Sequence, residues 1–241
     1  MRVDIVSLLP EIFEKVFSES VLGAAVRKGV VEIVLHQLRE YATDRHRVVD
    51  DTAFGGGPGM ILKPAPLIHC IRNVRKISDR PAPVIGLTPQ GIKLTQPVVR
   101  ELSKFERLIL VCGRYEGFDE RIISEFDMEL SVGDYVMTGG EIPAMAIVDA
   151  VARMLPGTVG RQESVEQDSF YDGCLDHPQY TRPAKWGGRE VPLILQQGNH
   201  ALIDEYRRAL SLIKTAVIRP DLLQKSKLSE NDREIIQKLF E

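Results

Sequence analysis

The strongest constraint on the fold is a regular alternation, through residues 1–155, of short β-branched segments with longer amphipathic ones. Short runs rich in Val, Ile and Leu are typical of buried strands, and an amphipathic stretch between two of them is typical of a crossover helix. The pattern therefore predicts an α/β fold built on a parallel sheet. The expected strands are Val3–Leu8, Val31–Leu35, Val84–Leu87, Leu108–Cys112 and Met128–Val132, with an extension through Tyr135–Met137.

The segments between these strands predict helices with recognisable ends. Gly29 is placed to end a helix as its C′ residue, and Thr95 is placed to cap another. An apolar stripe of Met145, Val148 and Val151 predicts a third helix that stops at Pro156-Gly157. The expected helices of this half are Ile12–Lys28, Pro64–Ile77, Gln96–Phe105, Phe118–Phe126 and Ile142–Leu155.

The character of the chain changes after Gly160. Residues 161–200 are polar, contain several Pro and Gly residues and show little periodicity, and loops of that length are usually functional or disordered. Helices return at His200–Val217, capped by Asn199, and at Glu230–Phe240, where Ser229 and Asp232 form a capping box. We expect a catalytic domain over 1–160, a flexible linker over 161–175 and a small all-helical domain over 176–241.

Composition excludes several classes of protein. A formal net charge of −3 gives no global attraction to nucleic acid, so any RNA site must be a local patch. The three cysteines form no CxxC pair and argue against a disulfide framework, which favours a reducing, cytoplasmic location. The N-terminus does not resemble a signal peptide, and no stretch of about 18 uncharged apolar residues predicts a membrane span.

Three glycine-containing turns follow predicted strands and are candidates for a ligand site. They are Leu87–Gly91, Cys112–Gly117 and Ser131–Glu141, the last with a double glycine. In open α/β sheets ligands bind beyond the carboxyl ends of the strands, where glycine lets them approach the backbone. The alternative is that each glycine only permits a tight turn. No GxGxxG, GxxxxGK[ST], GxSxG, HExxH or Cys/His cluster is present, which disfavours dinucleotide, P-loop, serine hydrolase and zinc sites.

Spacing alone leaves the catalytic and RNA-binding residues open. Arg153 follows Asp149 by four residues and could form only a surface ion pair, and Asp168 could be a solvated carboxylate. Between Arg207 and Lys227 six basic residues face a single acid, Asp221, so the stretch could follow RNA phosphates or be a solvated helix face.

Long strings in the chain resemble the bacterial tRNA (guanine-N1)-methyltransferase family. They include DRHRVVDDTAFGGGPGM, LTPQG, LVCGRYEGFDERI and SVGDYVMTGGEIPAM in the first half. DSF, LDHPQYTRP, GNH and RPDLL follow in the second half. The strings run in order along nearly the whole chain. Small departures, Cys174, Gln197 and Tyr206, lie outside the cofactor turns and bear only on RNA docking.

The resemblance implies a SPOUT-type parallel sheet with a deep trefoil knot and an obligate homodimer whose active sites are shared between chains. It implies S-adenosylmethionine as methyl donor, magnesium-linked activity, and tRNA with guanosine 3′ of the anticodon as substrate. Asp168 matches the general base and Arg153 its companion, while the metal ligands stay unknown. The matching cofactor contacts are Leu87, Gly113, Tyr115, Glu116, Val132, Gly133, Asp134, Tyr135, Val136, Met137, Gly139, Gly140 and Pro143.

Two other functions stay open from the sequence. One is another knotted RNA methyltransferase, acting on ribose 2′-oxygens or on ribosomal RNA, which need not have Asp168. The other is a non-catalytic RNA-binding protein that keeps the fold.

Overall fold

The computed structural model describes residues 1–161, 163–224, 226 and 228–240, the last three residues by their backbone alone. Its contacts divide the chain into two compact units, Met1–Gly160 and Arg161–Glu241.

The first unit is built on a parallel sheet of five strands, as the alternating pattern predicts. The strands lie in the order β2-β1-β6-β5-β7, and every neighbouring pair is parallel. The central strand β6 is buried along its whole length, which is why its sequence is almost continuously apolar. The strands are β1 (Arg2–Ser7), β2 (Glu32–Gln37), β5 (Val84–Lys93), β6 (Arg107–Cys112) and β7 (Met128–Ser131).

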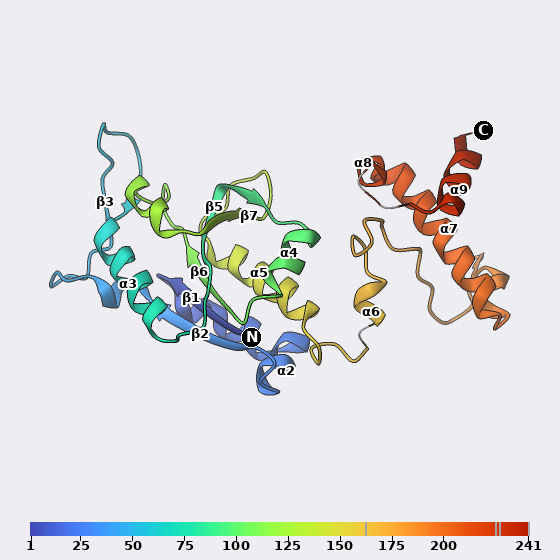
Figure 1. Ribbon diagram of the computed structural model, residues 1–241, viewed down its shortest axis with the longest axis horizontal. Coiled ribbons are helices and arrows are strands. Elements are labelled where there is room, and N and C mark those ends of the chain that lie inside the picture. The colour runs from blue at the N-terminus through green and yellow to red at the C-terminus, as the bar shows by residue number, and fades with distance from the viewer. Residues whose placement is uncertain (162, 225, 227, 241) are drawn as a thin grey trace. The chain divides into compact units, whose positions relative to one another are not determined.

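Helices cover both faces of this sheet (Figure 1). Because strand side chains alternate, Val3 and Ile5 of β1 join one core while Val6 joins the other. The first core packs against α2 (Ser20–Arg27), α4 (Gln96–Leu102) and α5 (Glu141–Met154), and the second against α3 (Pro64–Lys76) and the 3₁₀ helix η3 (Glu120–Glu125). Shorter elements are η1 (Pro10–Phe13), α1 (Glu14–Ser18), η2 (Leu38–Tyr41), β3 (Asp50–Asp51) and β4 (Ile61–Leu62).

Several predicted elements differ from the structure. The helix expected over Ile12–Lys28 is interrupted because Glu19 is extended and Ser20 has a φ of 60°. The extension expected at Tyr135–Met137 is not a strand, since these residues turn back toward β6. The helix expected over Phe118–Phe126 is the 3₁₀ helix η3, and Thr95 precedes α4 without a side-chain capping bond. Gly29 does end α2, with a φ of 70°.

A buried charge cluster fixes one end of the sheet. The Asp4 carboxylate on β1 accepts hydrogen bonds from Arg107 Nε and His36 Nε2, both at 2.8 Å, and from Arg2. Burial alone would raise the pKa of Asp4, but these bonds outweigh it and hold the pKa well below its usual range. Arg107 also donates to the carbonyl oxygen of Val74 at 2.6 Å, so the cluster ties the end of α3 to the sheet.

The second unit is mostly helical and irregular. Asn199 caps α7 (His200–Ile218), and Ser229 and Asp232 form the predicted capping box at α9 (Glu230–Phe240), with bonds of 3.1 and 3.0 Å. The smaller elements are α6 (Glu163–Glu166), a hairpin of β8 (Lys185–Trp186) and β9 (Arg189–Glu190), η4 (Leu193–Gln196) and α8 (Pro220–Leu223).

Candidate functional site

Three turns meet at the carboxyl edge of the sheet, because β6, β5 and β7 are parallel neighbours and their carboxyl ends lie on the same side. The turn after β6 contacts the turn after β7. Gly140 N–H donates to Gly113 O at 2.7 Å, and Arg114 and Gly139 form an isolated antiparallel β-bridge. The third turn is a bulge inside β5, where Leu87 and Ile92 both pair with Leu130 of β7. The strand predicted to end at Leu87 therefore resumes after the bulge and continues to Lys93.

Glycine is required where these turns approach each other. A Cβ on Gly140 would lie 2.7 Å from Cα of Cys112, and one on Gly91 would lie 2.5 Å from the backbone of Leu130. A Cβ on Gly113 would lie 3.0 Å from the carbonyl oxygen of Leu87. The explanation of these glycines as packing requirements is therefore sound, and it does not exclude a ligand site beside them.

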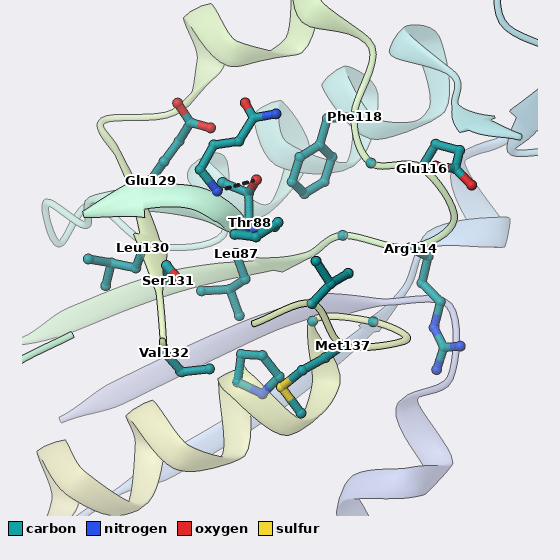
Figure 2. A pocket seen from close by; sticks show the side chains of 18 of the residues that line it. Leu87, Thr88, Arg114, Glu116, Phe118, Glu129, Leu130, Ser131, Val132 and Met137 are labelled. Carbon is teal, nitrogen blue, oxygen red and sulfur yellow. Dashed lines mark hydrogen bonds between the residues drawn. The ribbon is translucent and has the colours of Figure 1, made fainter. Parts of the chain in front are cut away.

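The turns enclose a cavity of about 210 Å³ (Figure 2). Leu87, Phe118 and Met137 line it from three different segments of the chain (Figure 2). The residues predicted to bind the cofactor that line this cavity are Leu87, Gly113, Tyr115, Glu116, Val132, Tyr135, Val136, Met137, Gly139, Gly140 and Pro143. Gly133 and Asp134 do not line it: Asp134 is exposed and pairs with Lys93.

The charges around the cavity are mainly acidic. Glu116, Glu120 and Glu129 line it, whereas the guanidinium of Arg114 is engaged by Glu141, with Nε 3.2 Å from the carboxylate. Glu141 is buried at the first turn of α5 and also accepts from Ser7 Oγ at 2.8 Å. An acidic wall suits a ligand that carries positive charge, such as an ammonium or sulfonium group.

The cysteine near the cavity is not a nucleophile. Cys112 is buried, and burial, with a smaller contribution from the Glu141 charge, raises its pKa far above the usual range. Burial also raises the pKa of Cys70 to about 12 and, to a lesser degree, that of Cys174. All three are free thiols that stay protonated at neutral pH.

The two predicted catalytic residues lie in different units. Arg153 is exposed in the last turn of α5. Asp168 follows α6, is half-buried, and lines a second cavity of about 260 Å³ within the second unit. His177, Arg207 and Arg208 line the same cavity. The catalytic roles of Asp168 and Arg153 stay predictions.

The segment that follows Asp168 is bonded to one face of α7. Ser211 Oγ donates to Leu175 O at 2.5 Å, and Leu175 N–H donates to Thr215 Oγ1 at 2.9 Å. Lys214 Nζ donates to Asp176 O at 3.1 Å. Arg208 adds an ion pair with Asp172 at 2.5 Å. Residues 172–175 of the predicted linker are therefore held against α7 by hydrogen bonds and an ion pair.

The basic stretch on α7 and α8 has acidic partners, and most of them lie outside the stretch itself. Arg208 pairs with Asp172 and, through two bonds of 2.9 Å, with Asp232. Arg207 lies 3.9 Å from Asp204, and Arg219 pairs with Asp221. Lys225 and Lys227, which belong to the same predicted stretch, lie outside the described residues. Much of the positive charge counted along the sequence is thus neutralised through space.

Among the described residues, no group of three or more His, Cys, Asp or Glu side chains is arranged to hold a metal ion. No helix in the part of the chain that the structure describes is long and apolar enough to cross a lipid bilayer.

Comparison with known proteins decides the family. The model of the family described as tRNA (Guanine-1)-methyltransferase TrmD matches residues 1–225. The chain belongs to this family. It is 50% identical to a tRNA (guanine-N(1)-)-methyltransferase of Geobacter sulfurreducens, over 99% of this chain and 98% of the relative. Proteins of the same name in Dehalococcoides mccartyi (46% identical, over 100% and 97%) and Chloroflexus aurantiacus (51%, over 94% and 89%) are also similar. The family predicted from the sequence strings is confirmed.

The structure also brings forward residues that the sequence reading missed. Phe118 and Glu129 line the first cavity, and Arg208 with Asp172 and Asp232 anchors the segment after Asp168. The β8–β9 hairpin was missed as well, although Gly187-Gly188 between two short runs is a hairpin signal.

Proposed function

We propose that the protein transfers a methyl group from S-adenosylmethionine to N1 of the guanosine immediately 3′ of the anticodon in tRNA. Membership of the family makes the chain a tRNA (guanine-N1)-methyltransferase. The observation that carries the cofactor assignment is the cavity at the sheet edge, which is lined by most of the residues predicted from the family strings. Its backbone-lined, acidic walls fit a cofactor with a sulfonium and an ammonium group.

The methyl donor, when bound, supplies an electrophilic methyl group. Guanine N1 carries a proton and is a poor nucleophile until that proton leaves. We assign its removal to the Asp168 carboxylate, a general base of a type that contributes about 10²–10⁴-fold to rate. Negative charge then develops on guanine O6, where the Arg153 guanidinium would stabilise it. In support of this role, Asp168 lines the second cavity within its own unit.

The knot, the dimer and the domain roles are part of the same proposal. The path of the chain after β7 supports a trefoil knot. β7 is an edge strand, and the turn that follows it crosses to the end of β6, where Gly140 bonds to Gly113. The chain then enters α5, which packs on β1 and β6. We propose a cytoplasmic homodimer in which Asp168 of one chain serves the cofactor cavity of the other. Residues 1–160 would be the catalytic domain, 161–175 a linker and 176–241 the tRNA-binding domain. No residue is assigned to magnesium.

Asp168→Asn tests the mechanism in the full-length protein. Nucleosides from treated tRNA would be separated by liquid chromatography, which distinguishes N1-methylguanosine from a 2′-O-methylated product. Single-turnover rates should fall by about 10²–10⁴-fold with cofactor affinity unchanged, since the amide cannot accept the N1 proton. A 2′-O-methylated nucleoside from the wild type would overturn the proposed reaction, and wild-type rates in the variant would overturn the role of Asp168.

A further inference from the structure

An exposed hairpin in the second unit carries the single tryptophan of the chain. Gly187 and Gly188 form its turn with φ values of +56° and +78°. Two consecutive positive φ angles match the twist of a tight two-residue hairpin. Beyond the turn, Val191 N–H donates to Ala184 O at 2.8 Å, so the ribbon is closed at both ends.

The two faces of this hairpin differ in chemistry. Lys185 stands opposite Glu190, and Trp186 stands opposite Arg189. Directly opposite residues of an antiparallel pair lie on the same face. Lys185 Nζ donates to the Glu190 carboxylate at 2.7 Å, so that face is neutralised. The other face presents an indole beside a guanidinium.

That second face is open. The Trp186 side chain is 78% exposed, and every residue over 179–190 is exposed, including Tyr180. Within the described ranges, neither Arg182 nor Arg189 lies within ion-pair distance of a carboxylate, in contrast to Arg208 on α7. The hairpin therefore combines a π surface with positive charge that is not neutralised.

We propose that the Trp186–Arg189 face binds unpaired nucleotides of the tRNA substrate. The indole would stack on a nucleobase while Arg189 contacts a phosphate, the combination by which proteins hold single-stranded nucleic acid. Charge complementarity selects this occupant, because an RNA strand is a polyanion of flat bases and the face is aromatic and cationic. The inference rests on the tRNA methyltransferase function and names a segment that contacts the RNA.

Tryptophan fluorescence tests the proposal, because the chain has one tryptophan and emission excited beyond the tyrosine absorption band reports Trp186 alone. The full-length protein would be titrated, without methyl donor, with an anticodon stem-loop that has guanosine 3′ of the anticodon. A blunt RNA duplex of equal length serves as comparison. We expect the stem-loop to quench the emission and to protect it from acrylamide, and the duplex to do so far less.

Variants measure how much the Trp186 side chain contributes to the affinity for the stem-loop. Trp186→Ala should weaken stem-loop binding by about 5- to 150-fold, the range of one base–aromatic stack, whereas Trp186→Phe should keep most of it. The charge-neutral double variant Lys185→Ala/Glu190→Ala alters the opposite face and should bind like wild type. Cofactor affinity, measured by calorimetry, should be the same in all variants and shows that they are folded.

Each contrary outcome has a distinct meaning. Unchanged emission at saturating stem-loop overturns the proposal, as does equal quenching by the duplex, which would indicate phosphate contact without stacking. Emission that changes with protein concentration in the absence of RNA would assign the face to a second copy of the chain. Failure of the proposed function looks different: RNA binds and quenches, but no N1-methylguanosine forms.

Discussion

Arg208→Ala should loosen the segment that follows Asp168. In the structure the guanidinium joins three parts of the second unit: α7, the Asp172 carboxylate beyond Asp168, and the Asp232 carboxylate at the start of α9. The Asp232 side chain is 8% exposed and that of Arg208 is 30% exposed. Removing Arg208 leaves Asp232 mostly buried, and among the described residues its remaining contacts are the capping bonds with Ser229.

The expected loss of stability follows from these exposures. Breaking a fully buried ion pair costs about 3–5 kcal/mol, and breaking an exposed pair costs about 0.2–1 kcal/mol. The Arg208–Asp232 pair has one buried and one partly exposed member, so the cost of breaking it should lie between these values, at about 2–3 kcal/mol. For a unit of the size of Arg161–Glu241 this lowers the melting temperature by about 10–20 °C.

The pH dependence gives a second signature. Hydrogen bonding to Arg208 is the largest of the effects that lower the pKa of Asp232 to about 2, from a usual value near 3.8. Because the folded pKa is depressed, the stabilisation is present above about pH 4 and is lost as the pH falls toward about 2. In Arg208→Ala this part of the acid transition should be shallower.

Calorimetry of the full chain, with hydrogen exchange of residues 168–177, would measure both effects. Arg219→Ala is the matched control, because Arg219 also forms a two-bond pair with an aspartate, Asp221, but at an exposed site. Its melting temperature should equal that of wild type. If Arg208→Ala also melts like wild type and amides 168–177 keep their protection, the idea that Arg208 anchors this segment is wrong.

Three further predictions concern other parts of the chain. Asp4→Asn should destabilise the first unit by about 3–5 kcal/mol in urea unfolding, because it leaves Arg107 buried without its anion. Gly140→Ala should lower the yield of folded protein, since its Cβ would meet the backbone of Cys112, whereas Gly160→Ala, with open space around it, should not. Mixing Asp168→Ala chains with chains whose cavity is obstructed by Val132→Trp should restore roughly a quarter of wild-type methylation, because half the dimers would be mixed and would hold one intact site. No recovery in confirmed heterodimers would exclude a shared site.

The sheet was predictable because its strands read as short apolar runs, and β1 and β6 at its centre are buried almost throughout. The same property hid the bulge in β5, since Thr88–Gly91 looks like the end of a strand and only pairing with β7 shows that the strand resumes. The broken helix near Ser20 was equally hidden, because the apolar pattern continues through a residue whose φ is positive. Hydrophobic periodicity reports burial and not backbone continuity.

The cavity residues were predictable only as a set of turns. Parallel topology places strand ends at one edge, so Gly113 and Gly140 were expected to lie close together. The topology does not predict that the Arg114 guanidinium donates to Glu141, or that Asp134 pairs with Lys93 and does not line the cavity. Those outcomes depend on side-chain partners that lie far apart along the sequence.

Charge counting along the chain does not show the carboxylates that approach from elsewhere in the fold, and these bear on where RNA contacts should be sought. The stretch from Arg207 has a strong positive excess in sequence, yet Asp172, Asp204 and Asp232 approach it from outside or from the preceding turn of α7. A cation already paired with a carboxylate gains little from a phosphate, because the first pair must break. The hairpin has fewer basic residues, but Arg189 stands beside an exposed indole and opposes no acid across the strands. For a protein of net charge −3, the cations that remain unneutralised after folding determine the salt dependence of RNA binding. Arg189→Ala should therefore flatten that dependence more than Arg208→Ala does.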